Sequence, residues 1–479
     1  MLFSAYLFIP GNTLDVTAIQ GVIMDKKIIA LIAVIAAVAI IAAAAFFLMG
    51  GEKEKDVTKV DAEYALQILG NADEDMTIND KDVTIIREII KGNLKFSDYP
   101  FADANNDGKI TQDDVKITSD LASKKSGTKA YVVNINKEGN RAVTEVTYPL
   151  SKIVPYGINI VAPIMTIDGG RCVAAYFASA YPNNEASMQG VDLKGGSRSI
   201  GDAAWQNFLT TDASVHFDAF VYTYDARAQV LDTYISDMNE AKIPILCYPA
   251  ADADGELRAA VTLGFLFGGK SETLGLKYAD IYLNILDQIK NKVGGKTDAQ
   301  KTTYIAMNMD TSICQNDSTY NTMGAIAGGI PYYKTDSAFA EKYKGTSSSA
   351  ASTVEALSNV NADKFLSYRS IDHLKSGDDI KKIYVDRWEY SNSKGVMVKD
   401  LFEYSDDEDL VIYINNILPA PVRVAYSLYW LYPDIFSKTW ADSIMQKFID
   451  EGFTPYAGKT IGKELVTTFT YQDYKNAKS

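Results

Sequence analysis

Short apolar runs alternate with longer stretches of helical periodicity through most of the chain after residue 150. The apolar runs have the length of strands, and they predict strands at 152–157, 217–223, 243–249, 302–309 and 381–388. Between them, stretches such as 225–241 and 441–452 repeat apolar residues at three- and four-residue steps, which is typical of helices. This alternation predicts an α/β fold built on parallel sheets.

The longest helix that the pattern predicts covers residues 271–293. Tyr278, Ile281 and Ile285 belong to its continuous apolar face, and the Gly-Gly-Lys that follows is a stop signal. Such a helix would join two α/β lobes and leave a cleft between them. The boundaries that we predict are 131–270 for a first lobe with a leading hairpin, 271–294 for the linking helix and 295–479 for a second lobe.

Residues 28–49 form an apolar run without a single charge. This run is long enough to span a bilayer as a helix. Lys26 and Lys27 precede it, and positive charge before a span favours an inside N-terminus. We therefore expect residues 1–50 to hold a single-pass anchor in the cell membrane, with the residues after 50 outside the cell. A cleaved signal peptide is the alternative, although its apolar region is normally shorter.

Two acidic loops of the same length lie between this anchor and the lobes. The sequence "DANNDGKITQDD" begins at Asp103, and "NADEDMTINDKD" begins at Asn71. Aligned position by position, the loops offer oxygens at positions one, three, five, seven and twelve. These residues are Asn71, Asp73, Asp75, Thr77 and Asp82 in the first loop, and Asp103, Asn105, Asp107, Lys109 and Asp114 in the second. A tandem repeat of this detail predicts a paired metal site.

Calcium is the cofactor that this oxygen pattern predicts. It takes roughly six to eight oxygen ligands, and alternate residues of a tight loop turn their carboxylates inward. The backbone carbonyls of Thr77 and Lys109 would supply position seven. Gly108 permits a sharp turn at position six of the second loop, whereas Met76 takes that position in the first. We therefore expect the first site to bind calcium more weakly.

Each loop ends in Asp and is followed by an apolar helix, "VTIIREII" or "VKITSDL", and the pair resembles a dockerin domain. The resemblance covers residues 62–122 and implies a small all-α, EF-hand-like calcium-binding domain, which we place at 57–123. It also implies a cohesin-like protein as a partner. The alternative is that calcium only stabilises a short stalk, because a domain of this size has a marginal core and gains stability from bound ions.

Composition and short motifs narrow the classes of function. The formal net charge of −14 argues against nucleic acid as a partner, because phosphate contacts require a basic surface. Cys172, Cys247 and Cys314 are widely spaced and odd in number, so they predict no disulfide framework. His216 and His373 are too few for a histidine-based metal site. The sequence has no motif of serine hydrolases, zinc proteases or nucleotide-binding loops, and we expect no enzyme.

The region 130–475 resembles, in ordered pieces, the iron-siderophore and cobalamin type of substrate-binding protein of ABC importers. The pieces include the leader "VNINKEGNRAVTEVTYPLSKIVPYG", the strand "MNEAKIPILCYP", the long helix and the late helix "LPAPVRVAYSLYWLYPDIF". The resemblance implies two Rossmann-like lobes, a rigid joining helix, a ligand clamped between the lobes and delivery to an ABC permease. The acidic docking residue that usually follows the family's first strand has no match, since Asp168 comes several residues late.

The ligand that this resemblance implies is a metal chelate or macrocycle, namely a ferric siderophore, haem or a corrinoid. Ligands of α/β folds bind beyond the carboxyl ends of the strands. Aromatic rings suit flat macrocycles, and an arginine suits an anion. The candidate ligand-binding residues on this reasoning are Tyr156, Asn159, Trp205, Tyr222, Tyr224, Tyr248, Arg369 and Trp388.

The sequence therefore favours a membrane-anchored extracellular substrate-binding protein that captures a metal chelate for an ABC importer. Two alternatives stay open at this point. One is a dockerin-bearing cell-surface enzyme such as a hydrolase, because a pair of carboxylates for sugar hydrolysis leaves no spacing signature in a sequence. The other is an adhesive or scaffold protein that uses calcium to fix its geometry.

Overall fold

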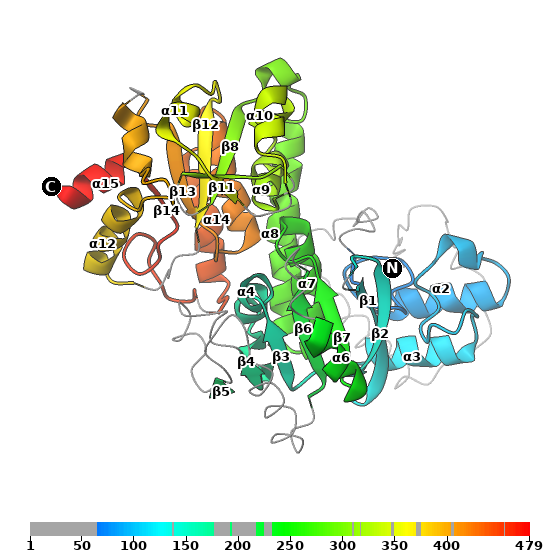
Figure 1. Ribbon diagram of the computed structural model, residues 1–479. Coiled ribbons are helices and arrows are strands. Elements are labelled where there is room, and N and C mark those ends of the chain that lie inside the picture. Colours follow the sequence, from blue (N-terminus) through cyan, green and yellow to red (C-terminus); the bar gives the residue numbers. More distant parts are fainter. Residues whose placement is uncertain are drawn as a thin grey trace, which may run out of the picture. The chain divides into compact units, whose positions relative to one another are not determined.

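The computed structural model describes residues 65–136, 138–176, 192–193, 217–224, 232–308, 311–316, 318–345, 349–369, 375–403, 407–454 and 456–479. Lys59–Ser479 form one compact unit, shown in Figure 1. Among the described residues, no helix combines the length and the apolar character that crossing a membrane requires. The anchor predicted at 28–49 and the candidate Trp205 lie outside the described residues.

The two acidic loops each lead into a helix, as the sequence predicts. These helices are α2 (Asp80–Ile90) and α3 (Gln112–Ala122), with the short helix η2 (Phe96–Asp98) between them. Asn79 caps α2 and Thr111 caps α3, while the carboxylates of Asp82 and Asp114 accept hydrogen bonds from the backbone N–H groups of these two caps. The helices share a small core of Ala72, Val83, Ile86, Ala102 and Val115.

An antiparallel hairpin connects this helical part to the first lobe, and it confirms the predicted leading hairpin. Its strands are β1 (Thr128–Ile135) and β2 (Arg141–Tyr148). Ile68, which precedes the first acidic loop, forms a β-bridge with Val132 of β1. On the other side, the Thr144 hydroxyl donates to the carbonyl oxygen of Ile245 at 2.9 Å. The hairpin therefore bonds to both neighbours.

The described part of the first lobe contains a parallel sheet in the order β3-β6-β7. Every residue of the middle strand β6 is buried, which is expected where helices cover both faces of a parallel sheet. The elements of the lobe are β3 (Ile153–Tyr156), α4 (Ile158–Thr166), η3 (Gly169–Cys172), β4 (Ala175–Tyr176), β5 (Asp192–Leu193), β6 (Ala219–Thr223), α6 (Asp232–Glu240), β7 (Ile245–Tyr248) and α7 (Ala253–Phe267).

The linking helix is α8 (Lys270–Lys292), within one residue of the prediction, and its apolar face is buried. Figure 1 shows α8 beside α7. A Cβ atom built on Gly275 would lie 2.7 Å from the carbonyl oxygen of Ala260, and one on Gly264 would lie 2.8 Å from that of Ser271. Only glycine leaves enough room at these two points, so the backbones of α7 and α8 are in direct contact.

The second lobe is built on a seven-stranded sheet in the order β11-β9-β8-β12-β13-β14, with β10 paired to β8. Its centre, β8-β12-β13, is parallel, as the alternation of strands and helices predicts. The elements are η6 (Asp298–Gln300), β8 (Thr303–Asn308), β9 (Ser312–Cys314), α9 (Tyr320–Ile326), β10 (Ile330–Pro331), η7 (Tyr332–Lys334), α10 (Ser337–Lys342), β11 (Ser349–Ala351), α11 (Val354–Ser358), β12 (Lys364–Arg369), α12 (Gly377–Trp388), η8 (Val398–Glu403), β13 (Val411–Asn415), α13 (Ala420–Leu431), α14 (Lys438–Asp450), β14 (Thr468–Thr470) and α15 (Tyr471–Lys478).

The strand predicted at 381–388 is wrong, because these residues belong to helix α12. Asp378 and Asp379 lie in the first turn of α12, where the helix dipole favours negative charge. Trp388, the last residue of the helix, has no exposed surface. Its ring packs against the rings of Phe402, Tyr413, Tyr471 and Tyr474. The expectation that Trp388 follows a strand and faces a ligand thus loses its basis.

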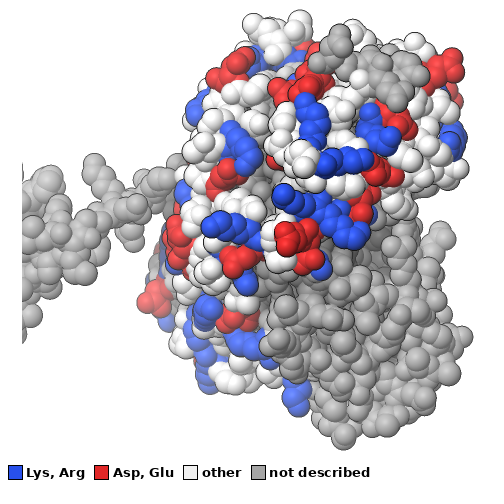
Figure 2. All heavy atoms as spheres, turned by 90° about the vertical axis from the view of Figure 1, so that its left-hand side faces the viewer, with Lys and Arg blue, Asp and Glu red and all other residues white. Residues whose placement is uncertain are grey.

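Positive and negative side chains are mixed on the part of the surface that Figure 2 shows. On the second lobe, Lys475 pairs with Glu408 at 2.7 Å, and Lys478 pairs with Glu389 at 2.6 Å. The excess negative charge of the chain is therefore not gathered into a single acidic surface on this face.

Candidate ligand and metal sites

Three of the candidate tyrosines lie at the carboxyl ends of first-lobe strands. Tyr156 ends β3, while Tyr222 and Tyr224 lie at the end of β6. The rings of Tyr156 and Tyr222 pack on Phe220, with centroid distances of 6.4 and 5.9 Å. Tyr222 is 1% exposed and burial raises its pKa, so it is a core residue. Tyr156 and Tyr224 are only partly buried, and they are the two that keep surface at the strand ends.

Two further candidates also follow strand ends, as the sequence predicts. Asn159 lies in the first turn of α4, which begins directly after β3, and its side chain is half-buried. Arg369 is the last residue of β12 and pairs in register with Asn415, the last residue of β13. The two lobes therefore each present a row of strand ends, and these rows contain Tyr156, Asn159 and Arg369.

A buried ion pair joins the helix that follows β7 in the first lobe to the helix that follows β13 in the second lobe. Glu256 lies in the first turns of α7, after β7, and Arg423 lies in the first turns of α13, after β13. Their side chains are in contact, and each residue is 3% exposed. The Glu256 carboxylate also accepts hydrogen bonds from the backbone N–H of Ala420, at 2.9 Å, and from the Tyr278 hydroxyl. Elements of both lobes and the linking helix thus meet at one carboxylate.

The environment of this carboxylate explains its electrostatics. Burial raises the pKa of Glu256, and the Arg423 guanidinium opposes that rise. Burial and the nearby Glu256 carboxylate raise the pKa of Tyr278 well above its ordinary value, so the phenol stays protonated and donates. Arg423 donates a second hydrogen bond to Asn416 at 3.0 Å. The pair is therefore enclosed and held by several hydrogen bonds, although the Nε atom of Arg423 has no hydrogen-bond partner among the described residues, and this arrangement suits a fixed contact between the lobes.

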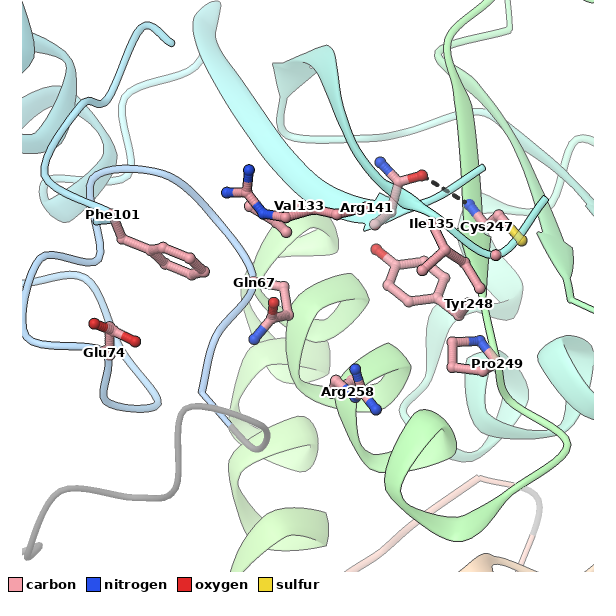
Figure 3. A pocket seen from close by; sticks show the side chains of 12 residues that line it. Gln67, Glu74, Phe101, Val133, Ile135, Arg141, Cys247, Tyr248, Pro249 and Arg258 are labelled. Carbon is pink, nitrogen blue, oxygen red and sulfur yellow. Dashed lines mark hydrogen bonds between the residues drawn. The ribbon is translucent and has the colours of Figure 1, made fainter. Parts of the chain in front are cut away.

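A cavity of about 420 Å³ lies where the acidic-loop part, the hairpin and the first lobe meet; we call it the junction pocket. The acidic-loop part contributes Gln67, Glu74 and Phe101. The hairpin and the first lobe contribute Arg141 and Tyr248, among others. In Figure 3, the side chains of Phe101, Arg141 and Tyr248 point toward one shared space. Tyr248 is thus the predicted ligand-binding residue that lines a described cavity.

The wall of the junction pocket is held by hydrogen bonds between the hairpin and β7. The Asn134 side chain accepts a bond from the backbone N–H of Cys247 at 3.3 Å and donates one to the hydroxyl of Thr144 at 3.0 Å. Burial raises the pKa of the Cys247 thiol to about 12. Asn134 is therefore a structural residue of the wall, and Cys247 is protonated at neutral pH.

Matching hydrogen bonds show that the two acidic loops have the same conformation. Asp82 in the first loop accepts from the backbone N–H of Asp73 at 3.1 Å, and Asp114 in the second accepts from that of Asn105 at 3.3 Å. At position five, Asp75 accepts from the backbone N–H of Thr77 at 2.6 Å. Asp107 accepts in the same way from Lys109 at 2.8 Å. The alignment of the two loops is therefore confirmed in three dimensions.

Position one differs between the loops in a way that bears on metal binding. In the second loop, the Asp103 carboxylate accepts hydrogen bonds from the backbone N–H groups of Asp107 and Gly108, at 3.0 and 2.8 Å. In the first loop, the Asn71 amide donates to the carbonyl oxygens of Leu66 and Asp75. The Oδ1 atom of Asn71 is buried and accepts no hydrogen bond from the described residues. Calcium would supply the missing partner of this oxygen.

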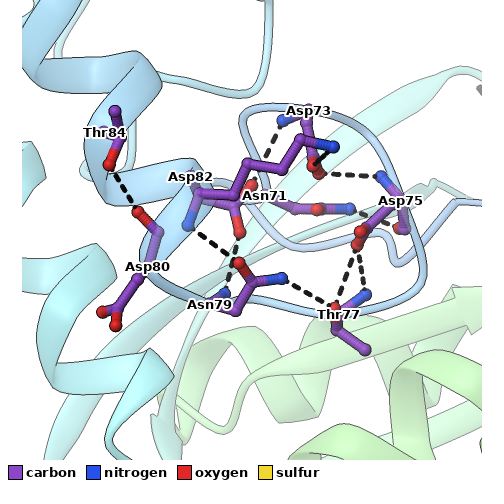
Figure 4. Close-up of polar contacts among 9 residues, drawn as sticks. Asn71, Asp73, Asp75, Thr77, Asn79, Asp80, Asp82 and Thr84 are labelled. Atoms are coloured by element: carbon purple, nitrogen blue, oxygen red, sulfur yellow. Dashed lines mark hydrogen bonds and ion pairs between the residues drawn. The ribbon is translucent and has the colours of Figure 1, made fainter. Parts of the chain in front are cut away.

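Lys81 places a positive charge at the first loop. Its ammonium lies 2.8 Å from the carboxylate of Asp73, and Figure 4 shows Asp73 beside Asp75 and Asp82 in this loop. The second loop has Asp113 at the same position. Burial, with the charges of Asp73 and Asp75 adding to it, raises the pKa of Asp82 to about 7. The first loop thus carries carboxylates that repel one another and one internal cation that partly compensates them.

The acidic loops contain oxygens of mixed origin. Within the described ranges, no group of three or more His, Cys, Asp or Glu side chains is arranged so that these alone would hold a metal ion. Calcium sites also use amide and backbone carbonyl oxygens, which here come from Asn71, Asn105, Thr77 and Lys109. The residues present fit calcium when these oxygens are included with the carboxylates.

Four charged residues of these sites are absent from the sequence-based predictions. Glu256 and Arg258 lie in the first turns of helix α7, beside Asp254 and before a largely apolar stretch, and Arg423 is the single charge in α13. Arg141 opens the second strand of the hairpin. A lone charge inside an apolar helix is a usable signal, because such a charge is stable there only with a partner. The position of Arg141 gives no such signal.

Comparisons with known proteins give a likeness of fold. The chain matches no protein-family model and no curated protein. Among solved structures it is similar to the TroA-like periplasmic binding protein FepB from Veillonella parvula, with 12% identity over 71% of this chain and 99% of that chain, and a TM-score of 0.49. CeuE from Helicobacter pylori, solved as a Ni-His complex, has 15% identity, coverages of 67% and 95%, and a TM-score of 0.45. A periplasmic haem-binding protein from Pseudomonas aeruginosa has 11% identity, coverages of 59% and 93%, and a TM-score of 0.37.

Proposed function

We propose that this chain is a substrate-binding protein of an ABC importer, anchored outside the cell by residues 28–49, which captures a metal chelate between its two lobes and delivers it to a permease. A ferric siderophore, haem or a corrinoid is the class of ligand. Residues at the strand ends, with Tyr156, Asn159, Tyr224 and Arg369 among them, would contact the ligand. Tyrosine rings would stack on a flat chelate, and Arg369 would meet its negative charge.

The observation that carries this proposal is the contact, through the Glu256–Arg423 pair, between the helices that follow β7 and β13. In parallel α/β sheets, ligands bind beyond the carboxyl ends of the strands. Here the helices that follow β7 and β13 are joined at those ends by a buried charge pair. A ligand placed beside this contact would touch both lobes, which is how a two-lobed protein encloses a small molecule.

A ligand panel tests the proposal. The full chain, purified in mild detergent, is titrated with a ferric catecholate siderophore, haem, cyanocobalamin, nickel-histidine and molybdate, and its melting temperature is followed. The panel includes nickel-histidine and haem because CeuE and the Pseudomonas protein are described with them. We expect one member to raise the melting temperature in a saturable manner. If none does, while a panel of oligosaccharides is hydrolysed, the surface-enzyme alternative replaces this proposal.

We also propose that the two acidic loops bind calcium and that the helical part is a dockerin-like module. The buried Asn71 Oδ1 without a hydrogen-bond partner and the matching hydrogen bonds of the two loops support this. The ligands would be the ten residues at positions one, three, five, seven and twelve. Calcium titration by isothermal calorimetry tests it, and absence of heat at micromolar to millimolar calcium would contradict it. A cohesin-like partner would be sought by pull-down with calcium and with chelator.

A further inference from the structure

The junction pocket shares no lining residue with the chelate contacts proposed above, which are Tyr156, Asn159, Tyr224 and Arg369. Its lining comes from the acidic-loop part, the hairpin, the end of β7 and helix α7, and no lining residue belongs to the second lobe. Arg258 lines the pocket from α7, whereas Glu256, two residues earlier on that helix, faces Arg423 of the second lobe. Opposite sides of α7 therefore serve two different sites.

A hydroxyl group in the pocket wall lacks a hydrogen-bond partner within the described part of the chain. The hydroxyl of Tyr248 is buried without a hydrogen bond, and the residue is only 2% exposed. A buried hydroxyl without a partner costs about 1–3 kcal/mol. Burial also raises the pKa of Tyr248, so the group is a neutral donor. A ligand oxygen that reaches this hydroxyl would accept the hydrogen bond that the described residues leave unmade.

The charges around this hydroxyl favour an anion. Arg141 lines the pocket from β2 and Arg258 from α7, while Glu74 is the acidic residue of the lining. Arg258 also interacts with other groups of the protein, so it contributes positive charge to the pocket rather than a guanidinium group with all its N–H donors available to a ligand. Arg141 is exposed at the hairpin. Guanidinium groups bind carboxylate and phosphate oxygens with two parallel hydrogen bonds.

The rest of the lining is apolar. Phe101, Val133, Ile135 and Pro249 cover the remaining wall. The volume of about 420 Å³ is in the range of pockets for small organic ligands. We infer that the junction pocket binds a small organic oxyanion, whose charged group contacts Arg141 and the Tyr248 hydroxyl and whose apolar body lies against Phe101 and Val133. This site goes beyond the proposed chelate function and does not depend on it.

The test uses three probes that share a phenyl ring and differ in the charge of their polar group. Benzoate, phenyl phosphate and neutral benzyl alcohol are titrated into the full chain and followed by saturation-transfer NMR and calorimetry. We expect benzoate or phenyl phosphate to bind at least about tenfold more tightly than benzyl alcohol, which corresponds to one charge-assisted contact. The stronger of the two anions identifies the carboxylate or the phosphate class. Equal binding of all three probes, or none, would overturn the inference.

Four variants locate the binding. Tyr248→Phe removes only the hydroxyl and should weaken the anion about three- to tenfold, and Arg141→Gln should weaken it about tenfold or more. Glu74→Gln removes the opposing charge and should strengthen binding about two- to fivefold. Tyr131→Phe removes a hydroxyl from strand β1, which also carries the lining residue Val133, but Tyr131 lies outside the pocket; it is the matched control and should change nothing. Circular dichroism and melting temperature confirm that each variant is folded.

The outcomes separate this inference from the proposed function. Arg141 is not among the strand-end residues proposed to contact the chelate. The variant Arg141→Gln should therefore keep its affinity for any chelate while its affinity for the anion falls. Anion binding that is insensitive to Arg141→Gln, Tyr248→Phe and Glu74→Gln would place the probe elsewhere and overturn the inference. If the unmodified chain binds the anion but no member of the chelate panel, only the proposed function is contradicted.

Discussion

The thiols of Cys172, Cys247 and Cys314 are all free and buried. Burial raises the pKa of each of them, and that of Cys247 reaches about 12. A pKa of about 12 leaves roughly one thiolate in ten thousand at pH 8, and the thiolate is the reactive form. We expect iodoacetamide at pH 8 to modify the native chain at least about a hundredfold more slowly than the urea-unfolded chain.

The same shift gives a pH dependence with a definite sign. The folded state holds the Cys247 proton more tightly than the unfolded chain does, so the stability from this proton is fully present below about pH 8.5. It is lost as the pH rises from there toward the folded pKa of about 12. Urea unfolding at pH 8 and at pH 10, with Cys247→Ala as control, measures this loss. Fast alkylation of native Cys247 would contradict both expectations.

A substitution at Asp107, with a substitution at Asp113 as control, tests calcium binding at the second loop. It lies at position five, and its carboxylate accepts the backbone N–H of Lys109. Asp107→Asn keeps the size of the side chain but removes a charge, and we expect it to weaken calcium at the second loop at least about tenfold. Asp113→Asn removes an exposed charge from the same loop and should change calcium affinity less than about threefold. Calorimetry of both variants measures the difference, and equal affinities would contradict the metal site.

At the scale of single residues, the sequence predicted the shared conformation of the two acidic loops, but it did not predict which strand-end side chains turn into the core. The loops follow from local spacing, because each oxygen is fixed by the backbone of the same twelve residues. Tyr222 shows the limit for ligand contacts: it ends a strand, as expected, but its ring turns into the core beside Phe220. Which way a strand-end side chain turns depends on packing from distant segments, which a local pattern does not contain.

Among the helices, the contact between α7 and α13 depends on one buried charge pair. Glu256→Gln leaves Arg423 buried without a negative partner, and we expect it to lower the free energy of unfolding by about 3–5 kcal/mol. The double variant Glu256→Leu with Arg423→Met removes both charges and should cost less than either single change. Removing the exposed pair Lys382–Asp386 should change stability by less than about 1 kcal/mol. Urea unfolding measures the free energy of unfolding of each variant. A double variant that is less stable than either single variant would contradict the expectation.

The close approach of α7 and α8 gives a second prediction for helix packing. Gly275→Ala puts a Cβ atom against the carbonyl oxygen of Ala260, and we expect it to lower the free energy of unfolding by about 1–3 kcal/mol. Gly377→Ala is the control, because a Cβ atom on that helix residue meets nothing within 4 Å. Thermal unfolding compares the two. A neutral Gly275→Ala would show that the helices separate without cost.

The elements themselves were largely predictable. The strands β3, β6, β7 and β8 and the linking helix α8 lie where the apolar patterns place them, because burial on both faces gives a strand a continuous apolar run. The segment 381–388 misled because Ile383, Tyr384 and Val385 favour strands by type. Its helical state follows from the acidic first turn of α12 and from the packing of Trp388, which are signals outside the run.

For the whole molecule, the acidic loops and the lobes should respond together to calcium. The four tryptophans, Trp205, Trp388, Trp430 and Trp440, all lie outside the loops and their helices. Lys124, which follows α3, pairs with Glu272 of α8, and Ile68 bonds to the hairpin. We expect calcium at a hundredfold excess over its Kd to raise the melting temperature reported by tryptophan emission by about 3–5 °C. A change in helix content without a change in the tryptophan transition would contradict this coupling.

The arrangement of the whole chain was only partly accessible from the sequence. Two α/β parts and a linking helix follow from alternation and length. The attachment of the acidic-loop part to the hairpin does not, because the bridge between Ile68 and Val132 joins residues that no local pattern relates. The junction pocket depends on that attachment, and this is why its arginines were missed.

The glycine contact between α7 and α8 has a mechanical consequence. At Gly264 and Gly275 the backbones of α7 and α8 are in contact, with no side chain between them at these points that could change rotamer. We therefore expect α7 and α8 to move together as one rigid body. Against the second lobe, α8 is held by side chains such as Tyr278, whose ring meets Phe448 edge to face, and α7 is held by the Glu256–Arg423 pair, which any opening would have to break. Any opening of the molecule around a ligand would therefore pivot on the second-lobe side of α8.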